Sequence, residues 1–345
     1  MVAKVKGRAT IREVAAHAGV SFKSVSNVVN DRPYVSEELR AKVQQAIAEL
    51  GYRPHSIARS LASRRSNVIG VVLRAAPADA RADPFFSQFL FGTCATAGTQ
   101  GFGVLVNILL DEAPIHRYAD LFDHRQVDGV IMHSPRVDDA PGVEGAEHDL
   151  PVVLIGRPAP GTDTLAVDGD DEQGAFAALS HLIALGHRRI GMVANADPSY
   201  TVSVTRTQGY RRALVEHDLP FDESLLTSGH FTLQSGKVGM ARLLDLHHPP
   251  TAVFVSSDRM ALGAMHEVQS RGMIIPDDIA IVGYDDLLVA AHTCPALTSV
   301  RAPIDAISQR ATQMLIDAIR GLPVAPRQVI LPTELVIRQS SGTSA

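Results

Sequence analysis

The sequence predicts two kinds of fold in one chain: an all-α helix-turn-helix headpiece, followed by an α/β core of two doubly wound, parallel-sheet subdomains. Between residues 10 and 50, apolar side chains recur at the three- and four-residue spacing of short amphipathic helices. From residue 67 onward, short apolar runs alternate with longer helical segments, which is typical of parallel sheets covered on both faces. The runs fall into two series, so we expect two subdomains of the same class.

The first two helices are expected within the stretch TIREVAAHAGVSFKSVSNVVN. Thr10 and Glu13 can form a capping box at the start of the first helix. Gly19 ends that helix, because glycine readily takes the left-handed backbone conformation of a helix C-terminus. Ser21 then begins the second helix as its N-cap, and Val25 belongs to the apolar stripe that packs on the first.

A third helix is expected from its N-cap Ser36 to its closing residue Gly51. Three helices complete a small core, so we assign residues 1–54 to the headpiece. Residues 55–66 are expected to form a hinge and linker, with a short amphipathic helix over 55–62. Eight residues are too few to stay helical alone in water. The alternative, a merely flexible linker, would be richer in Gly and Ser and would lack the apolar pair that this segment carries.

A helix, a tight turn and a second helix are the arrangement that delivers the second helix into the major groove of DNA. Four side chains are expected to face outward near the start of that helix: Phe22, Lys23, Ser26 and Asn27. Lys23 can donate to guanine, and Asn27 can make a bidentate contact with adenine. The alternative is a pair of amphipathic helices in some other small bundle.

The formal net charge of −5 conceals a division along the chain. Residues 1–65 carry 12 Lys and Arg against 5 Asp and Glu, net +7, whereas the remainder carries 20 against 32, net −12. A basic end on an acidic body is typical of a nucleic-acid-binding module joined to a ligand-binding body.

Cys94 and Cys294 have no metal or redox spacing, and we find neither a signal sequence nor about 18 consecutive apolar residues. We therefore expect a cytoplasmic, nucleoid-associated protein without membrane contact.

The core contains seven apolar runs of four to six residues. The first series lies at 68–73, 103–106, 129–132 and 152–155, and the second at 190–193, 252–255 and 279–283. A helical segment over 302–320 follows the second series. Runs of this length, separated by helices, indicate two doubly wound sheets.

Residues 10–62 resemble the headpiece of the lactose-repressor (LacI/GalR) family of bacterial transcription regulators, through the stretch above, VSEELRAKVQQAIAELGYRP and the hinge SIARSLA. The motifs DPFF, HLIALGHRRI, SSDRMALGAM, VGYDD and PALTSVRAP follow in the family's order, so the resemblance covers nearly the whole chain. It implies a periplasmic-binding-protein-like core over 67–345, in which the segment 302–320 returns to the first subdomain. The subdomains are then expected at about 67–165 with 299–326, and at about 166–298 with 327–345. One departure is Asn27, where many members carry arginine.

The resemblance also implies that the hinge folds on DNA and inserts Leu61, beside Ala58, into the minor groove, where an apolar wedge kinks the duplex. Two headpieces on one two-fold axis require a palindromic, double-stranded operator, so we expect a homodimer. No heptad helix follows Leu335. The residues expected to contact DNA are Thr10, Ser21, Phe22, Lys23, Ser24, Ser26, Asn27, Asn30, Tyr34, Ser36, His55, Ala58 and Leu61.

Ligands of open parallel sheets bind beyond the carboxyl ends of the strands, where this sequence places arginines, carboxylates and phenylalanines. Such a set suits a polyol, because charged groups pair with neighbouring hydroxyls while a ring stacks on the apolar face. The resemblance implies that Arg206 and Asp285 hold the effector's hydroxyls and that Phe231 stacks on its ring. Alternatively, Arg206 pairs only with a surface carboxylate and the phenylalanines belong to the core, and Asp258 is expected mainly to cap a helix. The expected effector contacts are Phe85, Phe86, Arg157, Arg206, Phe231, Ser257 and Asp285.

The motifs GxGxxG, Walker A, GxSxG and HExxH are absent, and no two of the 14 histidines lie three or four residues apart. We therefore expect no enzymatic activity, no cofactor and no metal site. The sequence predicts a DNA-binding transcriptional regulator, a repressor released from its operator by a small-molecule effector that is a sugar or sugar derivative. Two alternatives stay open: a corepressor-dependent regulator that binds a nucleobase-like ligand, and a non-regulatory cytoplasmic sugar-binding protein.

Overall fold

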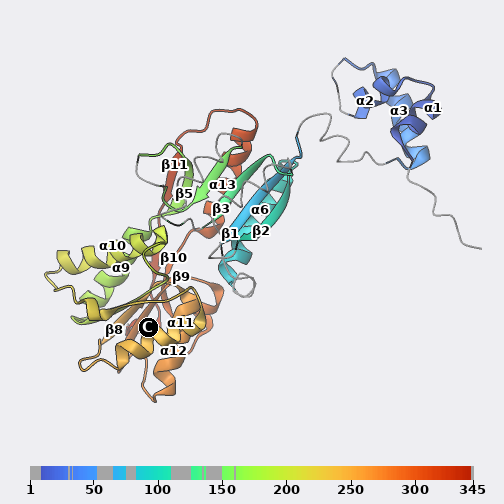
Figure 1. Cartoon of the computed structure of the whole chain (residues 1–345). Helices are drawn as coiled ribbons and strands as arrows, with labels where there is room; N and C mark the ends of the chain where they lie inside the picture. The colour runs from blue at the N-terminus through green and yellow to red at the C-terminus, as the bar shows by residue number, and fades with distance from the viewer. Residues whose placement is uncertain are drawn as a thin grey trace, which may run out of the picture. The chain divides into compact units, whose positions relative to one another are not determined.

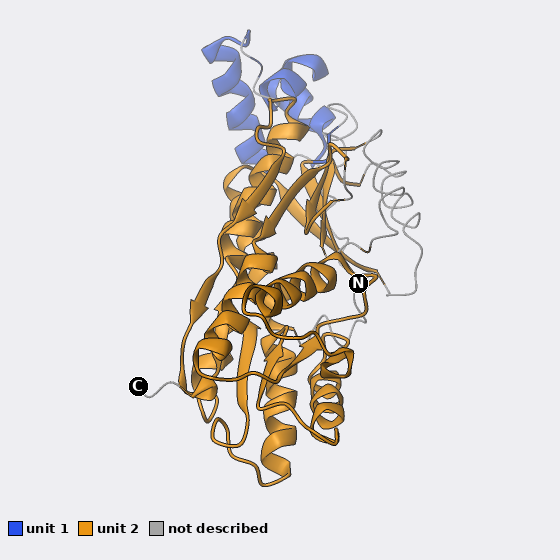
Figure 2. Ribbon diagram, turned by 90° about the vertical axis from the view of Figure 1, so that its left-hand side faces the viewer, with its two compact units in different colours: residues 1–66 blue, residues 67–345 orange. Residues whose placement is uncertain are grey.

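The computed structural model describes residues 9–29, 32, 34–52, 65–74, 83–109, 126–133, 136, 150–158 and 161–342. The chain divides into two compact units, residues 1–66 and residues 67–345, which Figure 2 shows in blue and orange. The division falls between the expected hinge and the expected core. Within the described ranges, no helix is both long and apolar enough to cross a membrane.

The first unit contains α1 (Ile11–Ala18), α2 (Phe22–Val29) and α3 (Glu37–Leu50). The predicted capping box is present, because Thr10 Oγ1 accepts the N–H of Glu13 at 3.3 Å and Glu13 Oε2 accepts the N–H of Thr10 at 2.6 Å. Gly19 ends α1 with φ +60°, and Gly51 ends α3 with the same φ. The helix limits that the sequence predicted are therefore confirmed.

One apolar core joins the three helices of the first unit. Val14 from α1, Val25 from α2 and Val43 from α3 are fully buried, and Ala46 and Tyr52 belong to the same cluster. Each fully buried aliphatic side chain contributes about 1.5–3 kcal/mol of hydrophobic stabilisation. The contact of α2 with this core fixes which of its faces remains exposed.

The second unit contains two six-stranded sheets (Figure 1). The first sheet has the order β11-β5-β4-β3-β1-β2, and all its strands are parallel. Its strands are β1 (Val68–Arg74), β2 (Gly103–Leu109), β3 (Gly129–His133), β4 (Val152–Ile155), β5 (Leu165–Gly169) and β11 (Gln328–Leu331). The helices α6 (Pro84–Thr99) and α13 (Ile304–Ile319) pack on each other and on one face of this sheet. We call this sheet with these helices the N-lobe.

The second sheet has the order β12-β10-β9-β8-β6-β7 and is parallel except for β12, which runs antiparallel to β10. Its strands are β6 (Ile190–Ala194), β7 (Leu226–Ser228), β8 (Ala252–Val255), β9 (Ala280–Asp285), β10 (Thr298–Arg301) and β12 (Glu334–Val336). Two helix pairs cover its opposite faces, namely α9 (Asp171–Ala184) with α10 (Thr201–Glu216), and α11 (Leu233–Leu244) with α12 (Asp258–Ser270) (Figure 1). Short 3-10 helices lie at Glu223–Leu225, Leu288–His292 and Gln339–Ser341. We call this second sheet with its helices the C-lobe.

The chain passes between the lobes three times, after β5, after β10 and after β11. The helix α13 returns to the N-lobe, as the resemblance implied. The passages come a few residues later than the expected limits at 165, 298 and 326, because the strand ladders extend past them. The strand β5 continues beside β4 and belongs to the first sheet through Gly169, while β10 pairs with β9 in the second sheet and β11 with β5 in the first.

Candidate DNA-binding surface and ligand cleft

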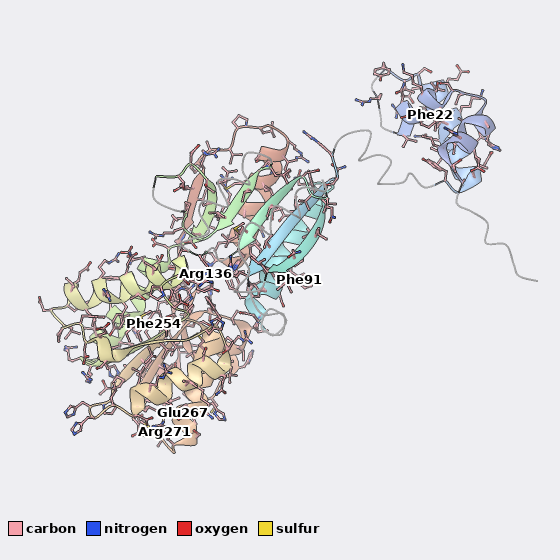
Figure 3. All side chains as sticks on the ribbon, viewed as in Figure 1. Phe22, Phe91, Arg136, Phe254, Glu267 and Arg271 are labelled. Atoms are coloured by element: carbon pink, nitrogen blue, oxygen red, sulfur yellow. The ribbon has the colours of Figure 1, made fainter. Side chains whose placement is uncertain are left out.

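The helix α2 presents polar and aromatic side chains to solvent. Phe22, labelled in Figure 3, is 54% exposed, and Lys23 beside it is exposed as well. Ser24, Ser26 and Asn27 are half-buried, at the margin between the exposed face and the core. The outward orientation expected of Phe22 and Lys23 is therefore present.

The remaining residues expected at the DNA surface differ in what their side chains do. Thr10 and Ser21 act as helix caps: Ser21 Oγ accepts the N–H of Ser24 at 3.0 Å. Tyr34 is 72% exposed, while Ser36 caps α3 by accepting the N–H of Leu39. Asn30, His55, Ala58 and Leu61 lie outside the described residues.

A cleft lies between the two lobes, at the carboxyl ends of their strands, and encloses about 110 Å³. Both lobes contribute polar side chains to it, and the N-lobe adds a wall of aromatic rings. The polar and aromatic residues that line it are Arg74, Asp83, Phe85, Phe86, His133, Asp168, Asp171, Asn195, Thr201, Arg206, His230, Phe231, Ser257, Arg259 and Asp285.

The guanidinium of Arg206 is the centre of a buried network in the C-lobe. Its Nε and Nη2 donate to Asp171 Oδ1 at 3.2 and 3.1 Å, and its Nη1 donates to the Ser256 carbonyl. Tyr284 donates its hydroxyl to the same Asp171 oxygen at 2.7 Å, and its ring lies 3.6 Å below the guanidinium carbon. Asp285 Oδ1 lies 3.7 Å from Nη2. The surface ion pair considered as an alternative for Arg206 is excluded, because its side chain is only 8% exposed.

Burial raises the pKa of two carboxyl groups in the cleft. Removal from water raises the pKa of Asp285 well above its usual value, against the opposing pull of Arg206. Burial likewise raises the pKa of Asp168, and the nearby charge of Asp171 adds to the effect. Asp285 also has φ +106°, a conformation that costs a non-glycine residue about 1–3 kcal/mol. Strain at a functional position is typical of binding sites.

Aromatic rings form the N-lobe side of the cleft. Asp83 begins α6 as its N-cap by accepting the N–H of Phe85 at 3.0 Å, which directs Phe85 and Phe86 at the cleft. His133, the last residue of β3, packs 5.0 Å from the ring of Phe85 and 5.2 Å from that of Phe86. Burial lowers the pKa of His133 to about 3, so this imidazole is neutral at physiological pH. Phe231 faces the cleft from the C-lobe with φ +54°.

Six of the seven expected effector residues line this one cleft: Phe85, Phe86, Arg206, Phe231, Ser257 and Asp285. Arg157 does not, because it lines a separate hollow beside β11 and lies 3.7 Å from Asp170. Ser257 caps α12, and the buried Asp258 holds the neighbouring loop by accepting the N–H of Leu287 at 2.8 Å. The expectation that Asp258 caps this helix is therefore wrong, because Ser257 occupies the cap position and Asp258 holds the loop instead.

Several cleft residues were missed in the sequence. Asp171 lies just after β5, whose sequence LAVDG has only three consecutive apolar residues and does not by itself indicate a strand. Asn195 and Arg74 stand directly at the carboxyl ends of β6 and β1, where that rule would have found them. His133 ends β3 in the same way. Within the described ranges, no group of three or more His, Cys, Asp or Glu side chains is arranged to hold a metal ion.

Arg136 and Arg259 make polar contacts between the lobes. Arg136, which follows β3, lies between the lobes in Figure 3 and donates from Nη2 to Ser199 Oγ at 2.9 Å. Its guanidinium lies 5.4 Å from the ring centre of Tyr200, with which it also shares a backbone bridge. In the second contact, Nη1 of Arg259 on α12 lies 3.9 Å from Oδ2 of Asp83 at the start of α6. These contacts are positioned to respond to any movement of one lobe relative to the other.

A helix-turn-helix headpiece, together with a polar and aromatic cleft between two doubly wound lobes, defines a class: DNA-binding transcriptional regulators with a ligand-binding core. Residues 10–55 match the model for bacterial regulatory proteins of the lacI family, and residues 179–341 match that of a periplasmic binding protein-like domain. The HTH-type transcriptional regulator CelR of Thermobifida fusca is 35% identical over 335 residues, 96% of this chain and 98% of CelR. The HTH-type transcriptional repressor CytR of Escherichia coli K12 is 32% identical over 339 residues, 98% of each chain.

Solved structures agree with these relatives. The Lac repressor dimer bound to operator and the anti-inducer ONPF matches with a TM-score of 0.86 at 29% identity, covering 97% of this chain and 99% of the repressor chain. The CelR–cellobiose complex matches with a TM-score of 0.75 at 34% identity, covering 96% and 100%. The chain belongs to the LacI family of DNA-binding transcriptional regulators, and the resemblance read from its motifs is confirmed.

Proposed function

We propose that this protein is a homodimeric repressor that binds a palindromic operator and is released from it by a sugar or sugar derivative bound in the interlobe cleft. The observation that carries the proposal is the composition of that cleft. Arg206 and Asp285 stand beside each other on the C-lobe, and the rings of Phe85 and Phe231 face the same space. A guanidinium and a carboxyl group beside an aromatic wall suit a ligand with hydroxyl groups on its edge and C–H groups on its face. The cellobiose bound by CelR is a ligand of this kind.

The mechanism that we propose is linkage between the two binding sites. A ligand that contacts both lobes favours one arrangement of them, and the equilibrium shifts by the difference in its affinity for the two arrangements. The contact of Arg136 with Ser199 and that of Arg259 with Asp83 cross the same gap. In this proposal the changed arrangement separates the two hinge segments of the dimer and withdraws Leu61 from the minor groove.

The test combines ligand screening with operator binding by the full-length protein. A thermal-shift screen of neutral sugars, polyols, sugar phosphates and nucleobases comes first, since a ligand at about 100 times its Kd stabilises the native state by about 2.7 kcal/mol. Operator affinity is then measured by fluorescence anisotropy with and without the ligand that binds. Release by a sugar supports the proposal. Tighter operator binding in the presence of a nucleobase would replace it with the corepressor mechanism, and sedimentation of a monomer on DNA would remove the homodimer.

A further inference from the structure

The side-chain carboxamide of Asn195 is a buried polar group of the cleft that has no role in the mechanism proposed above. It stands directly after β6, on the floor of the cleft, and its residue is 1% exposed. No donor among the described residues reaches its Oδ1, which is fully buried. A buried acceptor without a partner is costly, and native proteins keep few of them.

The backbone on both sides of Asn195 is firmly held. The carbonyl of Asn195 accepts the N–H of Phe231 at 2.9 Å, and the carbonyl of Ala194 accepts the N–H of Gly229 at 2.7 Å. On the other side, Ser203 donates its hydroxyl to the carbonyl of Ala196 at 2.6 Å. These bonds fix the backbone that carries the carboxamide beside the cleft, whereas the carboxamide oxygen accepts no hydrogen bond from the described residues. Fixed placement of an unsatisfied group is typical of a pre-organised binding site.

The neighbouring charges of the cleft are already engaged with one another. Arg206 donates Nε and Nη2 to Asp171 and Nη1 to the Ser256 carbonyl, so only part of its donor capacity remains for a ligand. Four aspartates line the cleft, at positions 83, 168, 171 and 285. Three arginines also line it, at positions 74, 206 and 259, so the cleft carries no large excess of positive charge to hold a phosphate or carboxylate. A hydroxyl group donates as well as accepts, so it can pair with Asn195 whichever amide atom it meets.

We propose that Asn195 is a further ligand-binding residue, which pairs with a hydroxyl group of an uncharged, polyhydroxylated effector. This inference rests on the proposed sugar-controlled function and narrows it to neutral sugars and polyols. Phe231, anchored to the Asn195 carbonyl, provides a ring next to that hydroxyl. Asn195 therefore selects among sugars that share the contacts with Arg206 and Asp285.

The experiment compares the full-length wild type with Asn195→Ala by isothermal titration calorimetry against D-glucose, cellobiose and their monodeoxy analogues. The affinity of Asn195→Ala for a sugar that binds the wild type should fall at least about tenfold. One monodeoxy analogue, which lacks the hydroxyl group that pairs with Asn195, should bind the wild type about tenfold less tightly than the parent sugar. Its affinity should be the same for the wild type and for Asn195→Ala, because the two changes remove the same hydrogen bond. Gln208→Ala is the matched control, since it removes an exposed carboxamide from α10 outside the cleft.

Thermal unfolding without ligand separates a binding role from a structural one. Because Oδ1 of Asn195 accepts no hydrogen bond from the described residues, Asn195→Ala should lower the Tm of the ligand-free protein by less than about 3 °C. Equal sugar affinity of wild type and Asn195→Ala would overturn the inference and leave the proposed function intact. If Asn195→Ala greatly lowers the Tm of the ligand-free protein and weakens the binding of every analogue alike, Asn195 has a structural role and the inference is overturned as well. If only phosphorylated or acidic sugars bind the wild type, the inference that the effector is uncharged is wrong. If no sugar binds, the proposed sugar-controlled function is itself wrong.

Discussion

Arg206→Met should destabilise the ligand-binding core by about 3–5 kcal/mol, because it leaves Asp171 buried without its counter-charge. The side chains of Arg206 and Asp171 are only 8% and 6% exposed, so water screens neither charge. Methionine retains much of the length and packing of arginine while removing the charge and all five donors. Of the three hydrogen bonds to Asp171 Oδ1 described above, only that from Tyr284 would remain.

Urea unfolding followed by far-UV circular dichroism measures this loss, since the chain has no tryptophan to report it by fluorescence. The double variant R206M/D171N should recover part of the loss, because it removes both charges rather than one. Arg212→Met is the matched control on the same helix. Arg212 lies 2.8 Å from Glu172, but its side chain is 34% exposed, so the loss should stay within about 1 kcal/mol.

A loss below about 1 kcal/mol for R206M, or a double variant as unstable as the sum of the single ones, would refute the reasoning that the pair is buried and coupled. Where R206M remains folded, its affinity for operator should be retained while its response to sugar disappears. An unchanged response to sugar would remove Arg206 from the ligand site, even if the predicted destabilisation were observed.

Three further perturbations test other parts of the molecule. Leu61→Ala should lower operator affinity in fluorescence anisotropy and leave sugar affinity unchanged, and equal DNA binding would contradict the hinge role that the resemblance implied. Arg136→Ala removes the hydrogen bond to Ser199 across the cleft, so the ligand-free protein should show a larger radius of gyration in small-angle X-ray scattering; an identical scattering curve would contradict an interlobe role. Asp258→Asn tests a buried carboxyl group whose pKa is raised to about 7 by burial, from an ordinary 3.8. The contribution of this raised pKa to the free energy of unfolding is fully present below pH 4 and is lost as the pH rises to about 7, with a slope approaching 1.4 kcal/mol per pH unit. The free energy of unfolding of the wild type minus that of Asp258→Asn should therefore fall across that range. A difference that does not change with pH would contradict the raised pKa.

The headpiece was predictable because its signals are local. The capping box of Thr10 and Glu13 and the left-handed Gly19 act within one turn of the helix, and the predicted limits of α1 are confirmed. In the core, the seven apolar runs predicted β1, β2, β3, β4, β6, β8 and β9. The strands β7, β11 and β12 have only three or four residues and are half-exposed, so neither length nor alternation marks them in the sequence.

The ligand cleft was less predictable because burial depends on contacts distant in sequence. Arg206 and Asp171 are 35 residues apart, and neither residue by itself signals that the other neutralises it. The rule of strand ends placed most of the expected residues in the cleft, yet it also suggested Arg157, whose side chain lies beside Asp170 in another hollow. A strand end fixes where the backbone arrives, whereas the direction of a following side chain depends on the loop.

The hydrogen-bonding of the cleft suggests a division between residues that maintain it and residues that select the ligand. Arg206 is held by Asp171 and the Ser256 carbonyl, so much of its binding capacity serves the fold, and a change there alters stability and ligand binding together. Asn195 contributes an unsatisfied oxygen, so a change there costs the fold little and alters the ligand contact directly. Residues of the second kind can vary while the lobes and their contacts remain intact. In a regulator with this architecture, differences in sugar preference should therefore arise at positions such as Asn195 before they arise at Arg206.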